Sequence, residues 1–206
     1  MKSYSWLMSA GILLTAMQWT ACSENKPAEP AKEVPVIAEV KPSFGGYASQ
    51  AEWGNHLVTI AGCNDCHTPK RMTPMGPVND SSLLLSGHPE NAPTPQVDRK
   101  LMESKGNIVT TDFTSWVGPW GISYTANLTP DETGTGNWKE EQFIYAIRNK
   151  VLKGLPGSRP LLPPMAVMTF GAMTDDELKA IFAYTRTIKP VKNSVPQPTP
   201  PALAKK

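Results

Sequence analysis

Two cysteines and a histidine stand close together in the chain, as Cys63-Asn64-Asp65-Cys66-His67. The spacing C-x-x-C-H is the attachment signature of c-type haem. Two thiols at this spacing can add to the two vinyl groups on one edge of a porphyrin, and the imidazole directly after them falls beneath the iron as an axial ligand. The motif therefore predicts one haem c, bound covalently through Cys63 and Cys66, with His67 as an iron ligand.

Two other kinds of site use a C-x-x-C pair. A structural zinc site needs four nitrogen or sulfur ligands. Beyond Cys63 and Cys66, the chain of 206 residues offers only three histidines and the distant Cys22. A thioredoxin-like redox pair belongs beside a βαβ unit, and strand-like runs are scarce in this sequence. Both alternatives are weaker than haem attachment.

Helices are the elements that we expect to position this motif. An apolar stripe at helical spacing, which includes Gly54 and Leu57, predicts a helix over 49–62 that ends at the cysteines. A second pattern predicts a helix over about 138–150, where two glutamates suit the positive end of the helix dipole. Thr174 and Glu177 form a capping-box pattern, and the apolar-faced helix that follows them stops at Pro190.

Composition divides the rest of the chain. Residues 1–21 have the pattern of a signal peptide, with Lys2 followed by an apolar run and small residues before Cys22. Residues 22–46 carry four prolines among alternating lysines and glutamates, which predicts a tether. Residues 47–189 are expected to form the folded domain. Residues 190–206 contain five prolines, so we expect a tail outside the packed domain.

The end of the leader resembles a bacterial lipobox. Small residues precede Cys22, which would become the lipidated first residue of the mature protein, although Trp19 stands where the lipobox usually has an aliphatic residue. A cleaved signal peptide followed by an incidental cysteine is the alternative. Both hypotheses export the protein, and lipidation would anchor it on the periplasmic side of the cell envelope.

Three stretches together resemble exported class I cytochromes c, especially the longer bacterial ones that often accompany membrane dehydrogenases. The stretches are 62–70, 126–143 and 163–193, and they occur in the order of that family. The resemblance implies an all-α fold around one haem. It also implies an electron carrier rather than an enzyme, with a dehydrogenase as donor and a cytochrome or oxidase as acceptor.

The same resemblance suggests further residue roles. A glycine on the first helix, here Gly54, would meet Phe182 or Tyr184 where the first and last helices cross. Gly76-Pro77 would supply a carbonyl for the second ring nitrogen of His67, which a ligand imidazole needs.

The resemblance also places a methionine ligand in a proline-rich loop before the last helix. Met165 follows Leu162-Pro163-Pro164 and fits best as the sixth iron ligand. Met168, Met173, His88 or an open position are the alternatives. His56, on the first helix, is expected to be a partly exposed polar residue without a role at the iron.

The stretch from Arg71 to Gly136 is longer than a minimal cytochrome c requires. It is rich in proline, glycine, serine and threonine, and we expect a loop-rich insertion there. A formal net charge of +2 gives no electrostatic sign of nucleic-acid binding. A haem enzyme or a gas-binding haem sensor, with an open sixth position, is the alternative to an electron carrier.

Overall fold

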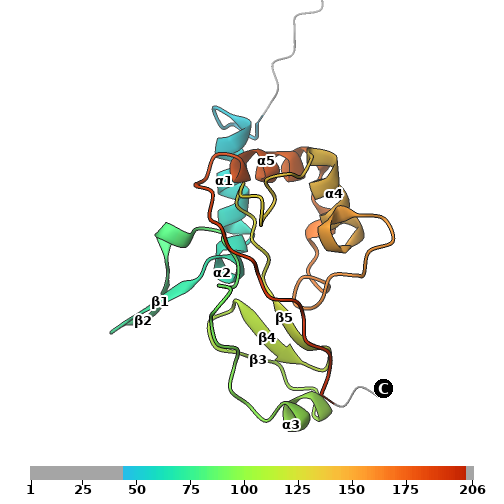
Figure 1. Cartoon of the computed structure of the whole chain (residues 1–206). Coiled ribbons are helices and arrows are strands. Elements are labelled where there is room, and N and C mark those ends of the chain that lie inside the picture. Colours follow the sequence, from blue (N-terminus) through green and yellow to red (C-terminus); the bar gives the residue numbers. More distant parts are fainter. Residues whose placement is uncertain (1–43, 203–206) are drawn as a thin grey trace, which may run out of the picture. The chain divides into compact units, whose positions relative to one another are not determined.

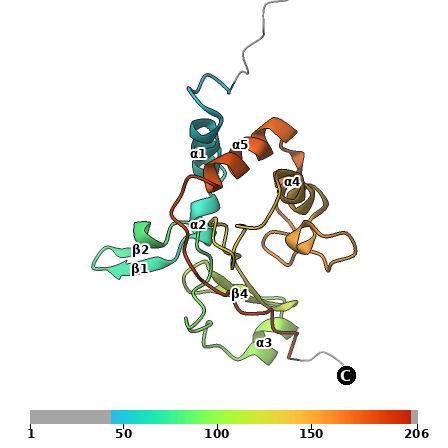
Figure 2. The ribbon, with the colours of Figure 1, turned by 45° about the horizontal axis from the view of Figure 1, so that its top comes forward.

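The computed structural model describes residues 44–202, all of which belong to one compact unit of the chain, Lys41–Lys206. The expected signal peptide and nearly all of the expected tether, Cys22 included, lie outside the described residues. Figures 1 and 2 show helices together with two small sheets. The unit must therefore be described as a mixed fold.

Three helices confirm the expectations from sequence. The first, α1 (Gln50–Ile60), begins after Ser49, whose side chain accepts a hydrogen bond from the Glu52 amide. The second, α4 (Glu140–Asn149), has two glutamates in its first turn. The third, α5 (Asp175–Thr185), is opened by the predicted capping box, in which the side chains and amides of Thr174 and Glu177 bond reciprocally. Two shorter helices, α2 (Cys63–His67) and α3 (Arg99–Ser104), complete the α-helices of the described part.

The hydrophobic core forms where α1 crosses α5, with α4 packed beside α5. An added Cβ at Gly54 would lie 1.9 Å from the Ala180 carbonyl oxygen and 2.9 Å from Tyr184 Cβ, so the two backbones touch here. The predicted close approach at Gly54 is thus confirmed, with Tyr184 as the side-chain neighbour. Phe182 instead packs against Phe143 of α4 at a ring-centroid distance of 5.4 Å.

The expectation of an all-α fold is wrong. Strands β1 (Lys70–Thr73) and β2 (Gly76–Asn79) form one antiparallel hairpin. A second antiparallel sheet contains β3 (Val109–Thr110), β4 (Ser115–Gly118) and β5 (Gly121–Tyr124). Apart from Lys70 at the start of β1, both sheets and α3 lie within residues 71–136, the stretch expected to be loop-rich. Strands of two to four residues are too short to show an alternating pattern, which explains why sequence reasoning missed them.

The C-terminal segment also departs from expectation, because residues 190–202 pack against the domain. Thr199 exchanges two main-chain hydrogen bonds with Ile122 of β5, at 2.8 and 3.0 Å. Farther on, the Ala202 amide donates to Glu103 of α3 at 2.6 Å. Figures 1 and 2 show this segment passing α2 and reaching the three-stranded sheet. Prolines hold a chain extended and suit a sheet edge, so a proline-rich composition did not prevent packing.

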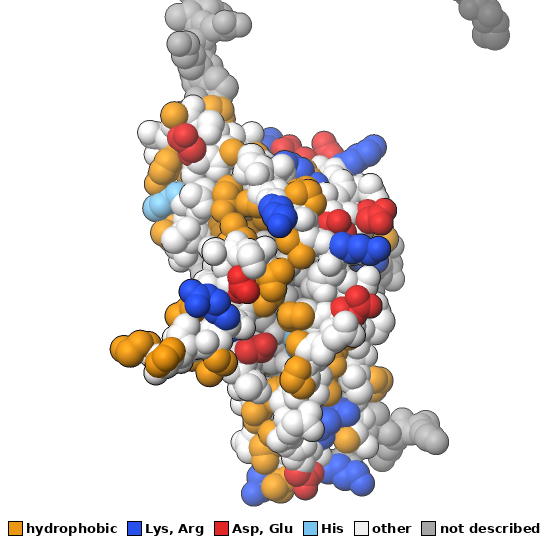
Figure 3. Space-filling model, turned by 60° about the vertical axis from the view of Figure 1, so that its left-hand side comes forward, with side chains coloured by type: hydrophobic (Ala, Val, Ile, Leu, Met, Phe, Trp, Pro, Cys, Tyr) orange, Lys and Arg blue, Asp and Glu red, His pale blue; other side chains and the backbone are white. Residues whose placement is uncertain are grey.

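The β1–β2 hairpin carries exposed apolar side chains. Met72 and Met75 are 77% and 95% exposed, and Figure 3 shows hydrophobic atoms at the projecting end of this hairpin.

None of the helices within residues 44–202 combines the length and the apolar character that crossing a membrane requires.

Gly54→Ala tests the crossing of α1 and α5. The new methyl group would overlap the Ala180 carbonyl, so the helices must separate. We expect the variant to lose about 3 kcal/mol or more of unfolding free energy, measured by denaturant unfolding. Asn55→Ala, one residue later on the exposed face of α1, is the control and should change stability by less than about 0.5 kcal/mol. Equal stability of Gly54→Ala and the wild type would contradict the packing.

Candidate functional site

The C-x-x-C-H motif forms its own short helix. The chain leaves α1 at Ile60, and Gly62 adopts a left-handed conformation with φ of 67°, which redirects the backbone. Helix α2 then contains both cysteines and the histidine. The Lys70 ammonium closes its end by donating to the carbonyl oxygens of Asp65, at 2.8 Å, and of Thr68. One rigid element therefore presents all three motif side chains.

Cys63 and Cys66 are half-buried and are not joined to each other as a disulfide. Burial raises the pKa of Cys63 to about 11 and also raises the pKa of Cys66. These raised pKa values contrast with the lowered thiol pKa that is typical of a dithiol redox site. Residues 44–202 contain no group of three or more histidine, cysteine or acidic side chains placed to hold a metal ion.

The ring of His67 is buried and held by a main-chain carbonyl. Its Nδ1 lies 2.8 Å from the carbonyl oxygen of Ala126. A carbonyl can only accept, so Nδ1 carries the proton and the neutral ring keeps a lone pair on Nε2. Burial also lowers the pKa of His67, which favours this neutral form. The imidazole is therefore in the state that binds iron, and its environment fits the proximal ligand of a haem.

The acceptor for His67 is not the one expected from the resemblance. Gly76 and Pro77 open strand β2 of the projecting hairpin, where Pro77 faces Met72. Ala126, 59 residues after His67, takes that place. A backbone carbonyl has no side-chain signature, so only the membership of Ala126 in one of the three resembling stretches pointed toward it.

Gly87 and His88 connect the motif to the Ala126 segment. The Gly87 amide donates to the carbonyl oxygen of His67 at 2.8 Å, and the His88 amide donates to the Thr125 carbonyl oxygen at 3.0 Å. The segment of Gly87 thus holds the main chain of His67, and the segment of Ala126 holds its ring. The orientation of the imidazole depends on how these two segments are held.

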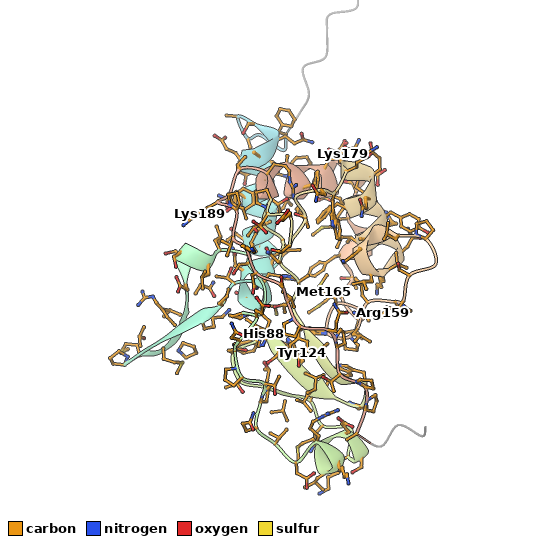
Figure 4. All side chains as sticks on the ribbon, in the orientation of Figure 1. His88, Tyr124, Arg159, Met165, Lys179 and Lys189 are labelled. Carbon is orange, nitrogen blue, oxygen red and sulfur yellow. The ribbon has the colours of Figure 1, made fainter. Side chains whose placement is uncertain are left out.

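Met165 lies in a turn that is tied down on both sides. The carbonyl oxygen of Pro163 accepts a hydrogen bond from Ser123 Oγ of β5 at 2.6 Å. The carbonyl oxygen of Ala166 accepts one from Lys150 Nζ at 2.7 Å, just beyond α4. Figure 4 labels Met165 in the middle of the unit, beside Tyr124 and His88 in that view. A partly buried methionine is thus held on a constrained loop.

The loop of Met165 and the ring of His67 are anchored to one short segment. Ser123 binds the loop, Ala126 binds the ring, and three residues of chain span about 11 Å at most. Helix α2 carries Cys63, Cys66 and His67 together, and residues 123–126 contact both this helix and the loop of Met165. Cys22 lies outside the described residues.

The other histidines are engaged elsewhere. His56 is exposed on α1, as expected, and stacks on Tyr47 at a centroid distance of 5.1 Å. His88 is 0% exposed. Its Nδ1 lies 2.7 Å from Thr114 Oγ1, and its ring packs on Tyr124 at 5.0 Å. Nε2 of His88 is buried and has no hydrogen-bond partner within residues 44–202. These contacts favour a structural role for His88.

The two alternative methionines lie close to Met165 in the chain. Met168 is 39% exposed, and Met173 is partly buried against the hydrophobic core. Both lie beyond residues 163–166, the part of the loop whose carbonyl oxygens bind Ser123 and Lys150.

Gly87→Ala tests how tightly the segment around His67 is packed. Gly87 has φ of +79°, and an added Cβ would lie 2.6 Å from the Ala126 carbonyl carbon. Backbone strain and this overlap should together lower the unfolding free energy by about 3 kcal/mol or more. Gly157→Ala is the matched control, because Gly157 has φ of +80° and no neighbour within 4 Å. It should lose only the strain, about 1–2 kcal/mol. Equal losses in denaturant unfolding would contradict the overlap.

Comparison with known proteins agrees with the chemistry of the motif. The chain is 27% identical over 175 residues to the fructose dehydrogenase cytochrome subunit of Gluconobacter japonicus, which covers 84% of this chain and 27% of that protein. It is 34% identical over 67 residues to the cytochrome c subunit of a gluconate 2-dehydrogenase from Pantoea cypripedii, covering 32% of this chain and 14% of that protein.

Another match, 37% identical over 82 residues, is to the cytochrome c subunit of a quinone alcohol dehydrogenase from Gluconacetobacter polyoxogenes, covering 39% of this chain and 17% of that protein. No protein-family model matches the chain. The chain spans about a quarter or less of the length of these relatives. Its homologues include cytochrome c subunits of dehydrogenases.

Proposed function

We propose that the protein is an exported, single-haem class I cytochrome c that carries one electron at a time from a dehydrogenase to a cytochrome or an oxidase. The observation that supports this most strongly is the environment of His67. A buried imidazole directly after C-x-x-C donates from Nδ1 to a carbonyl and keeps its Nε2 lone pair free.

Each motif side chain has one task in this proposal. The thiols of Cys63 and Cys66 would form two thioethers that hold the group on α2. His67, through Nε2, and Met165 would be the iron ligands. When bound, haem c supplies a reversible ferric–ferrous couple, and a thioether ligand favours the ferrous form. The protein holds the ligands in place and excludes water, and it needs no substrate pocket.

The names of the homologues support a dehydrogenase as redox partner. The fructose dehydrogenase and alcohol dehydrogenase proteins are named as cytochrome subunits, so we infer that this chain also serves such an enzyme rather than catalysing a reaction itself. The formal net charge of +2 supplies no strong basic field for docking. A transient, rather polar contact is the kind of interface that suits this exchange.

Export and anchoring belong to the same proposal. The leader and Cys22 support transfer to the periplasmic side of the envelope, with lipidation of Cys22 as the membrane anchor. Exported proteins meet an oxidising environment, in which free thiols form disulfides. Covalent haem would use both cysteines of the motif and leave no thiol there to oxidise.

Met165→Ala tests the sixth ligand and separates an electron carrier from a haem enzyme or gas sensor. The wild-type ferric protein should be low-spin and show the long-wavelength absorption band of methionine-ligated haem. The variant should lose this band and become high-spin. Met168→Ala and His88→Ala are the controls, and both should keep the band. A high-spin wild type would support an open sixth position, and an unchanged spectrum in Met165→Ala would contradict the ligand assignment.

A further inference from the structure

Asn193, in the C-terminal segment, is buried and fully hydrogen-bonded. It is 8% exposed. Its Nδ2 donates to the carbonyl oxygens of Ser86, at 2.7 Å, and His88, at 2.9 Å. Its Oδ1 accepts from the Glu90 amide at 2.9 Å. The side chain thus binds the residues before and after Gly87, and the Gly87 amide in turn donates to the carbonyl oxygen of His67.

Asn127 makes the corresponding contacts from the other segment. It is 4% exposed, and its Nδ2 donates to the carbonyl oxygen of Val191 at 2.8 Å. Its Oδ1 accepts from the Thr129 amide at 2.9 Å. Asn127 directly follows Ala126, so its side chain fixes the peptide unit that contains the Ala126 carbonyl. That carbonyl is the acceptor for His67 Nδ1.

Thr133 joins the two asparagines. Its hydroxyl oxygen accepts a hydrogen bond from the main-chain amide of Asn193 at 2.9 Å and lies 3.2 Å from Asn127 Nδ2. Residues 191–193 therefore hold both segments that position His67, the one that binds its main chain and the one that binds its ring. Buried amides with several partners fix a single geometry, because each lost partner would leave a polar group unsatisfied.

We propose that Asn127 and Asn193 are positioning residues, through which the C-terminal segment holds the Ala126 carbonyl on His67 Nδ1 and thereby sets the reduction potential of the iron. The proposal rests on the proposed haem site. A hydrogen bond from Nδ1 to a carbonyl makes the imidazole a stronger electron donor, which stabilises ferric iron. Weakening this bond should favour ferrous iron and raise the potential.

The test compares haem-loaded wild type with Asn127→Ala and Asn193→Ala by spectroelectrochemical titration. Both variants should shift the midpoint potential to more positive values. In reduced protein, the NMR signal of the His67 Nδ1 proton should exchange with deuterium faster than in the wild type.

Thr133→Val provides a milder variant if an asparagine variant fails to fold. It removes the shared acceptor, together with the hydrogen bond that the Thr133 hydroxyl donates to Asp131 Oδ1 at 2.6 Å, but keeps both asparagines, and it should give a smaller shift in the same direction. Glu103→Ala is the matched control, because Glu103 binds the same C-terminal segment at its far end, through the Ala202 amide. It should lower stability without moving the potential.

Three results would overturn the proposal. Asparagine and Thr133 variants that lose stability with unchanged potential and unchanged Nδ1 exchange would show a purely structural role. An equal shift in Glu103→Ala would show that any loosening of the segment has the same effect. A wild type that binds no haem would overturn this proposal together with the proposed function, whereas the first two results leave the haem site intact.

Discussion

The hydrogen bond between His67 Nδ1 and the Ala126 carbonyl is the contact on which the site depends. It joins a helix near the start of the domain to a segment 59 residues later. It decides which ring nitrogen carries the proton, and it fixes the direction in which Nε2 points. The surrounding elements hold the two partners of this hydrogen bond in place. One partner lies on α2, and the other lies in residues 125–127, directly after β5.

The two halves of the fold have different physical origins. The crossing of α1 and α5 is hydrophobic and tight, because Gly54 lets the backbones touch. The half that surrounds the Ala126 carbonyl is polar. There, buried threonines and asparagines, short strands and the C-terminal segment are joined by hydrogen bonds that leave few polar groups unpaired. A binding site between such halves can place an apolar group against the helices while polar contacts orient its ligand.

Sequence reasoning succeeded where the signal was local. The helical stripe before Cys63, the capping box at Thr174 and the glutamates of α4 each lie within a few residues of one another, and each element formed as predicted. It failed where structure depends on distant main-chain contacts. The strands, the pairing of Thr199 with Ile122 and the Ala126 acceptor leave little trace in residue type. The roles of Cys63, Cys66, His67 and Met165 stay predictions, and so does that of Cys22.

The proposed function requires that one haem is bound covalently through both cysteines of α2. Mass spectrometry of the purified protein under denaturing conditions measures this attachment. We expect the mass of one haem on the peptide that contains Cys63 and Cys66, with neither thiol open to alkylation. A chain without added mass, whose two thiols are alkylated or joined as a disulfide, would contradict it.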